Sequence, residues 1–202
     1  MGEEHSEALS DNIYFLENQE VIVNDFEAED FILDIGGGGE GIIGQLKGQQ
    51  VVAIDPKKRE LEEAPEGPLK VVMDAGELLF LDGSFNVATS FFTLMYINGL
   101  QHKKVLEEVF RVLRDGGRFI VWDMELPERL DESKEIVAAY LKVRLPNNEV
   151  NTGYGTKWPD QVQGLSYYTE IAVSVGFSLM KRDINGRVFR LEFRKQVSHL
   201  EG

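Results

Sequence analysis

The stretch ILDIGGGGEGIIGQL, from Ile32 to Leu46, places four consecutive glycines directly after one apolar run and directly before another. Glycine permits the positive φ of a tight turn and lets a ligand touch the backbone, and a helix beginning after the turn offers unpaired N–H groups. The alternative is a turn that binds nothing, but four glycines cost conformational entropy that a simple turn avoids. The stretch therefore predicts a strand, a ligand-binding turn and a helix.

More apolar runs follow the glycines. They are short and rich in β-branched and aromatic residues, as buried parallel strands are: FILDI (31–35), VVAID (51–55), LKVVMD (69–74), FNVATSFF (85–92) and GRFIVWDM (117–124). Helical patterns separate some of them, most clearly over 102–117, which has one apolar face. This alternation predicts an α/β fold with a doubly wound, mostly parallel sheet, in which ligands bind at the carboxyl ends of the strands.

The last part of the chain has a different pattern. Asn185-Gly186 is a two-residue hairpin signal between two apolar runs. After it, Phe189, Leu191 and Phe193 alternate with charged residues, as in a half-buried antiparallel strand. We therefore expect an antiparallel hairpin at the C-terminal end of the sheet.

Composition limits the function classes. The chain of 202 residues has the length of one domain, and 35 acidic against 21 basic residues give a formal charge of −14. Such a charge repels nucleic acids and anionic membrane surfaces, so neither is an expected partner. There is no cysteine, and the three histidines are far apart in sequence, so no metal site is predicted. With no apparent export signal or membrane-spanning run, the expected location is cytoplasmic.

Two segments stand apart from the strand and helix pattern. Residues 1–30 are acid-rich with short apolar islands, and we expect them to form an N-terminal helical cap on a main domain over 31–202. Residues 126–168 begin acidic, continue with a helical pattern and end rich in glycine, asparagine and aromatic residues. We expect this insert to form a lid over one edge of the sheet.

The glycines allow two ligands. Gly36, Gly38 and Gly41 satisfy the dinucleotide pattern G-x-G-x-x-G, which keeps NAD as a candidate. However, Asp34 and Glu40 flank the turn, and no Lys or Arg occurs between residues 31 and 46, which is unfavourable for a pyrophosphate. Acids also end the apolar runs at Asp34, Asp55, Asp74 and Asp123, an arrangement that suits a cationic nucleoside.

From about residue 31 to the end, the sequence resembles the class I S-adenosylmethionine-dependent methyltransferases. ILDIGGGGEG is similar to their first motif and VVAIDPKK to their second-strand motif, while HKKVLEEVFRVLRDGGRFIVWD is similar to their helix, turn and fifth strand. The resemblance implies a Rossmann-like sheet of seven strands that closes with an antiparallel hairpin. It also implies S-adenosylmethionine as the cofactor.

The resemblance assigns roles by position. It implies that Asp34 and the backbone around Gly36 and Gly38 hold the methionine portion, and that Asp55 accepts hydrogen bonds from the ribose hydroxyls. Pro56 would lie against the adenine, and Asp74 and the N–H of Ala75 would bind its edge. Phe91 would line the region of the sulfonium. An aspartate at a strand end can also have a purely structural role, as a cap for the following turn.

The sequence departs from the family pattern at several positions. Glu40 stands where the family usually has a third glycine, and Met95-Tyr96 stands where many small-molecule members have histidines. No Asn-Pro-Pro-Tyr stretch follows the fourth strand, which disfavours transfer to nucleic-acid bases or glutamine. The expected acceptor is therefore a small molecule.

Transfer from a sulfonium is an in-line displacement, for which positioning of donor and acceptor supplies much of the catalysis. Where the acceptor needs a base, Tyr96 and Asp123 rank first, ahead of His102, Glu125 and Tyr154. His102 is expected to be exposed or to cap a helix. The aromatic residues of the insert either floor an acceptor pocket or anchor a loop: Tyr154, Trp158, Tyr167 and Tyr168.

The sequence thus leads to three hypotheses. The first is methyl transfer from S-adenosylmethionine to a small molecule. The second is an NAD-binding domain, supported by the glycine spacing alone. The third is a protein that binds S-adenosylmethionine without catalysis, because fold resemblance defines a cofactor site better than a reaction.

Overall fold

A computed structural model describes residues 12–129 and 131–196. Its larger sheet has seven strands in the order β10-β11-β7-β6-β3-β4-β5. The strands are β3 (Ile32–Ile35), β4 (Val51–Asp55), β5 (Leu69–Val72), β6 (Phe85–Phe91), β7 (Leu113–Met124), β10 (Phe177–Asn185) and β11 (Val188–Lys195). The strands from β7 to β5 pair in parallel, whereas β11 is antiparallel to both its neighbours. The predicted fold class is confirmed.

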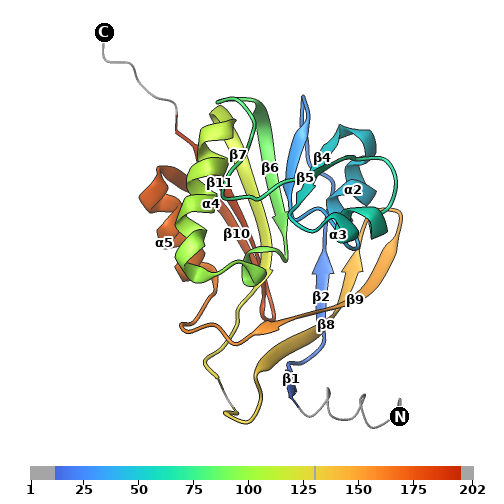
Figure 1. The fold of residues 1–202 in the computed structure, drawn as a ribbon, viewed down its shortest axis with the longest axis vertical. Coiled ribbons are helices and arrows are strands. Elements are labelled where there is room, and N and C mark those ends of the chain that lie inside the picture. Colours follow the sequence, from blue (N-terminus) through green and yellow to red (C-terminus); the bar gives the residue numbers. More distant parts are fainter. Residues whose placement is uncertain (1–11, 130, 197–202) are drawn as a thin grey trace.

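Helices lie on both faces of this sheet (Figure 1). They are α2 (Ile42–Lys47), α3 (Lys58–Glu63), α4 (Gly99–Val112) and α5 (Leu165–Val175), with the 3-10 turns η1 (Gly48–Gln50) and η2 (Leu94–Tyr96). Two cores result. One lies between the sheet and α4 and α5, and the other contains buried side chains of α2, β7 and the strands of a second sheet. Because both faces are covered, all four residues of β3 are buried, which explains why three of them are Ile or Leu.

The second sheet was not predicted. It joins β1 (Ile13–Phe15), β2 (Gln19–Ile22), β8 (Ile136–Arg144) and β9 (Glu149–Lys157). Figure 1 shows these strands at the end of the larger sheet toward which the arrow of β6 points. Its central strand is β8, which pairs in parallel with β1 and β2 and antiparallel with β9.

Two helical predictions are therefore wrong. In the N-terminal segment, residues 1–11 lie outside the described residues, but 13–15 and 19–22 are strands and no helix occurs in 12–30. In the insert, the segment expected to be helical is β8. Its buried residues Val137, Ala139, Leu141 and Val143 recur every second position, which is the period of a strand. Pairing between two segments more than 100 residues apart overrides the local pattern.

The C-terminal hairpin has the predicted form with a shift of one residue. Asn185 pairs with Val188, so the two residues of the turn are Gly186 and Arg187. Gly186 adopts a φ of 60°, which a residue with a side chain rarely adopts. Phe189, Leu191 and Phe193 are all buried, as expected. The hairpin extends the sheet on the side of β7, away from the glycine-rich turn.

Candidate functional site

A cavity of about 1010 Å³ opens at the carboxyl ends of β3, β4, β5 and β6. Its walls are the glycine loop (residues 36–41), the loops after β4 and β5, the segment around η2, and β9. Small-molecule sites in proteins commonly have this size and position. All eight predicted cofactor-binding residues line it: Asp34, Gly36, Gly38, Asp55, Pro56, Asp74, Ala75 and Phe91.

The glycine loop is tightly packed against the rest of the protein. Gly36 has a φ of +71°, and a Cβ placed there would lie 2.3 Å from the side chain of Thr93. At Gly38 a Cβ would lie 2.6 Å from the Cβ of Glu60. These two glycines are therefore required by the fold itself, whether or not a ligand binds. A simple turn without a ligand is expected to avoid the entropic cost of these glycines. At Gly36 and Gly38 this expectation is wrong, because a side chain would collide with Thr93 or Glu60.

Asp34 lies at the base of the loop and is only 2% exposed. Its Oδ1 accepts a 2.7 Å hydrogen bond from the hydroxyl of Thr89 on β6. Burial raises the pKa of Asp34 to about 7, against the opposing effect of that bond. A positive charge bound nearby would favour the ionised carboxylate, so the electrostatics of this position suit a cationic ligand.

Asp55 is the last residue of β4, and Asp74 lies two residues after the end of the neighbouring strand β5. Each carboxylate accepts a hydrogen bond from the backbone N–H two residues further along. Oδ1 of Asp55 accepts from the N–H of Lys57 at 2.8 Å, and Oδ1 of Asp74 accepts from the N–H of Gly76 at 2.7 Å. Both carboxylates therefore stabilise local turns, which is the purely structural role expected of an aspartate after a strand. No donor among the described residues reaches Oδ2 of Asp55. Burial raises the pKa of Asp55, which marks a partly desolvated acceptor in the cavity wall.

Acids outnumber bases around the cavity. Among the described residues, the carboxylates that line the cavity are Asp34, Glu40, Asp55, Glu60, Glu63, Asp74 and Glu77, whereas the lining cations are Lys57 and Lys104. Lys104 Nζ is already paired with Glu77 at 2.9 Å. The wall as a whole therefore favours a ligand with positive charge and disfavours a dinucleotide pyrophosphate. Sequence reasoning missed Glu60 and Lys104 because nothing in α3 or α4 distinguishes them from ordinary surface charges.

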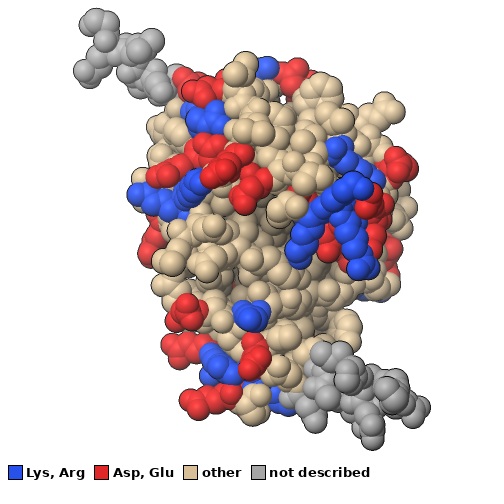
Figure 2. Space-filling model, in the orientation of Figure 1, with Lys and Arg blue, Asp and Glu red and all other residues tan. Residues whose placement is uncertain are grey.

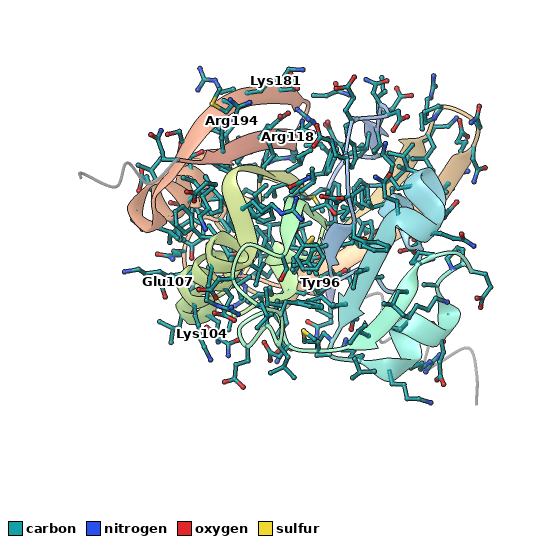
Figure 3. The ribbon with its side chains drawn as sticks, turned by 90° about the horizontal axis from the view of Figure 1, so that it is seen from above. Tyr96, Lys104, Glu107, Arg118, Lys181 and Arg194 are labelled. Carbon is teal, nitrogen blue, oxygen red and sulfur yellow. The ribbon has the colours of Figure 1, made fainter. Side chains whose placement is uncertain are left out.

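Tyr96, a predicted catalytic residue, lies in the cavity wall at the end of η2. Figure 3 shows Tyr96 near the middle of the view, whereas Lys104 lies toward one side of the molecule. The hydroxyl of Tyr96 accepts a 3.2 Å hydrogen bond from the N–H of Gly155 on β9. Partial desolvation, with the nearby charges of Asp123 and Glu40, raises the pKa of Tyr96 to about 12, so the hydroxyl stays protonated at neutral pH. Tyr96 is thus placed to orient a ligand rather than to accept its proton.

Asp123, the other predicted catalytic residue, does not line the cavity. It is completely buried on β7, and its two oxygens accept from the N–H groups of Met95 at 3.3 Å and Met124 at 2.8 Å. Burial raises its pKa to about 7. Through its bond to Met95, Asp123 therefore holds η2 in place, and its side chain does not reach the cavity.

His102 is neither exposed nor a cap, contrary to expectation. It is completely buried in α4, where Nε2 lies 2.9 Å from the carbonyl oxygen of Leu94 and Nδ1 lies 2.9 Å from the hydroxyl of Tyr167. Burial lowers its pKa. Because its partners come from η2 and α5, no local pattern around residue 102 could have indicated this position.

Of the four aromatic residues of the insert, one lines the cavity and the other three anchor neighbouring segments. Tyr154 lines the cavity and stacks on Phe92, with ring centroids 5.2 Å apart. Trp158 packs on Tyr14 at 5.8 Å and so anchors the second sheet. The remaining two pack around His102 and anchor α5: Tyr167 and Tyr168. Only Tyr154 is available to a ligand in this cavity.

The residues that line the cavity suit S-adenosylmethionine. It has the volume for a nucleoside with an amino-acid tail, a glycine loop open to the backbone, a partly free carboxylate at the end of β4, and an excess of acids to receive a sulfonium and an ammonium. Among the described residues, no group of three or more His, Asp or Glu side chains is arranged to hold a metal ion.

Comparison with known proteins agrees with this geometry. Residues 33–121 match the family model described as a methyltransferase domain. Over 54 residues the chain is 43% identical to a sterol 4-C-methyltransferase from Caenorhabditis elegans, a match that covers 27% of this chain and 16% of that protein. The match therefore spans only a small part of that relative's length.

Solved structures share the fold at low sequence identity. An S-adenosylmethionine-dependent methyltransferase from Methanosarcina mazei has a TM-score of 0.60 and 17% identity, covering 86% of this chain and 95% of its own. A 1,6-didemethyltoxoflavin-N1-methyltransferase from Burkholderia thailandensis, bound to its substrate and S-adenosylhomocysteine, has a TM-score of 0.54 and 15% identity, covering 83% and 72%. At these identities the likeness concerns the fold.

The fold is the Rossmann-like fold of S-adenosylmethionine-dependent methyltransferases, and the cavity is lined almost entirely by the region that matches the methyltransferase-domain model. The matched residues 33–121 contain the glycine loop and all eight predicted cofactor-binding residues. The interpretation as an NAD-binding domain is not supported by these matches.

Proposed function

We propose that the protein transfers the methyl group of S-adenosylmethionine to a small-molecule acceptor by in-line displacement. The observation that carries the proposal is the convergence of the glycine loop and the strand-end acids Asp34, Asp55 and Asp74 on one cavity. When bound, the cofactor supplies a methyl group activated by the sulfonium. The protein contributes binding, orientation and exclusion of water.

Each predicted cofactor residue has a proposed role that its surroundings support. Asp55 receives the ribose hydroxyls, because one carboxylate oxygen is already held by the backbone and the other has no donor among the described residues. Asp74 and the N–H of Ala75 bind the adenine edge, beside Pro56. The methionine portion lies toward the glycine loop and Asp34, with Phe91 at the sulfonium region. Phe91 is only 7% exposed and also belongs to the core.

On the acceptor side, Tyr96 is the proposed orienting residue. Its raised pKa keeps the hydroxyl protonated, and the bond from Gly155 leaves its own hydrogen free to donate to an acceptor molecule. Asp123 acts only through its support of η2. Catalysis by this chain therefore rests on positioning rather than on a dedicated base.

A small-molecule acceptor is supported by charge and by the relatives. Acidic and basic side chains intermingle on the face in Figure 2, without one broad basic field for a phosphate backbone. The Burkholderia neighbour is a methyltransferase for 1,6-didemethyltoxoflavin, and the Caenorhabditis relative is a sterol methyltransferase. Nucleic acid is therefore not a proposed partner.

The division of the chain remains a proposal as well. We place the methyltransferase domain at 31–202 and a cap at 1–30, with residues 126–168 as a lid within the domain. Gly153 and Tyr154 of the lid line the cavity, and the described part of the cap pairs with β8. A cytoplasmic location is proposed from the absence of cysteine. No helix within 12–129 and 131–196 has the length and apolar character needed to traverse a bilayer.

A second candidate function is binding of S-adenosylmethionine without transfer. It is favoured by one observation: of the two predicted catalytic residues, Asp123 is out of reach and Tyr96 stays protonated. An assay for S-adenosylhomocysteine production distinguishes the two functions. The purified protein is incubated with S-adenosylmethionine and the low-molecular-weight fraction of a cell extract, with the nucleic-acid fraction in parallel.

We expect production of S-adenosylhomocysteine with the small-molecule fraction and its loss in Asp55→Ala. Production with the nucleic-acid fraction alone would contradict the proposed acceptor class. Binding of the cofactor with no turnover in either fraction would support the non-catalytic function instead.

A further inference from the structure

One face of β9 contacts both loops that form the cavity rim. Thr152 and Tyr154 donate to the two carboxylate oxygens of Glu40 in the glycine loop, the latter at 3.0 Å from Oε2. Two residues further along, the hydroxyl of Thr156 donates to the carbonyl of Met95 in η2 at 3.1 Å. β9 thus joins the loop after β3 to the turn after β6.

The contact at Glu40 is chemically specific. An ionised carboxylate only accepts hydrogen bonds, so both its oxygens are matched to hydroxyl donors from β9. These donors lie 112 and 114 residues away in the sequence. Glu40 stands between Gly39 and Gly41, whose φ angles of 59° and 52° are left-handed, and its side chain connects this loop to the second sheet.

Tyr154 is held at two points. Its ring stacks on Phe92 at an interplanar angle of 12°, and its hydroxyl is held by Glu40. Phe92 is only 1% exposed and therefore fixed in the core. The ring of Tyr96 meets that of Tyr154 edge-on at 6.5 Å. The position of the Tyr154 hydroxyl in the cavity thus depends on Glu40, while its ring position depends on the core.

We propose that Glu40 is a positioning residue that couples cofactor binding in the glycine loop to the placement of Tyr154 and β9 on the acceptor side. The inference rests on the proposed function, because it needs the cofactor to bind at that loop. Coupling is reciprocal: if binding orders β9 through Glu40, loss of the contact weakens cofactor binding by the same free energy. A merely structural contact would stabilise β9 equally with and without cofactor.

Hydrogen exchange of the full-length protein, with and without saturating S-adenosylhomocysteine, tests the coupling. The readout is exchange at the backbone amides of β9, residues 149–157. We expect S-adenosylhomocysteine to slow this exchange by about tenfold in the unmodified protein, because ligand binding suppresses local opening of the segments it stabilises. In Glu40→Gly, which restores a glycine to the loop, the slowing should fall to about twofold or less.

Variants on the other side of the contact keep the test independent of loop flexibility. The double variant Thr152→Val with Tyr154→Phe leaves the glycine loop unchanged and should lose the ligand-dependent slowing to the same extent as Glu40→Gly. Asn151→Ala, an exposed residue of the same strand, is the matched control and should retain it. Circular dichroism and urea unfolding verify that each variant is folded.

Three results are decisive. Ligand-dependent slowing at β9 that survives in both Glu40→Gly and the double variant would overturn the inference. So would normal binding of S-adenosylhomocysteine to the unmodified protein with no change in β9 exchange. Absence of any binding to the unmodified protein would instead contradict the proposed function on which the inference rests.

Discussion

The hydroxyl of Thr89 donates a 2.7 Å hydrogen bond to Oδ1 of Asp34, and both side chains are buried beneath the glycine loop. Thr89 lies on β6 and Asp34 on β3, and the two residues are direct partners in the parallel register of these strands. The carboxylate at the base of the glycine loop is therefore held by the neighbouring strand, in an environment that opposes its ionisation.

This burial predicts a pH dependence of stability. The folded-state pKa of Asp34, about 7, lies above the unfolded value, so its contribution is fully present below the unfolded pKa and is lost as pH rises through 7. Asparagine does not titrate, so Asp34→Asn removes this pH-dependent loss of stability. The unfolding free energy of the variant relative to the unmodified protein should rise with pH, by up to about 1.4 kcal/mol per pH unit below pH 7.

Urea unfolding from pH 5 to pH 8 measures the difference. Asp25→Asn is a contrasting control: the hydrogen bond to Lys47 lowers the pKa of Asp25 below its ordinary value of 3.8, so its contribution is lost only in more acidic solution and the difference should stay constant across this range. A difference between Asp34→Asn and the unmodified protein that does not vary with pH would contradict the account of Asp34.

Asp55→Ala tests the ribose assignment. Loss of hydrogen bonds to a charged acceptor should weaken binding of S-adenosylmethionine by roughly 1.5 to 3 kcal/mol. Calorimetric titration gives the affinity, with Glu170→Ala, an exposed acid on α5, as the control. Unchanged affinity in Asp55→Ala would rule out contact between this carboxylate and the ribose.

Asp123 provides a different prediction, because it supports η2 without touching the cavity. Asp123→Ala leaves the buried N–H groups of Met95 and Met124 without their acceptor, which should lower the unfolding free energy by about 1–3 kcal/mol. Asp123→Asn retains one acceptor oxygen and should cost less. Affinity for S-adenosylhomocysteine should change by no more than about threefold in Asp123→Asn. A loss of two orders of magnitude would place Asp123 at the cofactor after all.

His102→Phe tests the buried histidine. Burial lowers the pKa of His102, so its contribution to stability is present above the unfolded value and is lost as pH falls through the folded value. The variant lacks both ring hydrogen bonds and should be less stable at pH 7.5 by about 1–3 kcal/mol. This deficit should shrink at pH 5, as measured by urea unfolding. A constant deficit would mean that His102 titrates as it does in the unfolded chain.

Much of the larger sheet could be predicted because its evidence is local. Strands β3, β4 and β6 are short, mostly apolar and almost entirely buried, since both their faces are covered, and each ends near a residue that lines the cavity. Parallel topology then brings these ends together at one edge. This is why residues such as Asp34, Asp55 and Phe91 could be assigned to one site from the sequence.

The second sheet was harder to predict from the sequence, because its strands pair residues 13–22 with residues 136–144. The period of two in β8 was available in the sequence, but alanines at 138 and 139 also suit a helix. The role of Glu40 was hidden for a related reason. Its partners lie on β9, and without the second sheet Glu40 is only a departure from a glycine pattern.

Calorimetric titration of the purified protein with S-adenosylmethionine, S-adenosylhomocysteine and NAD in parallel tests the central claim most directly. The acid-lined cavity predicts binding of the first two and none of NAD. Binding of NAD alone would show that the G-x-G-x-x-G spacing of Gly36, Gly38 and Gly41 was the true signal, and it would contradict the assignment of this cavity to a methyl donor.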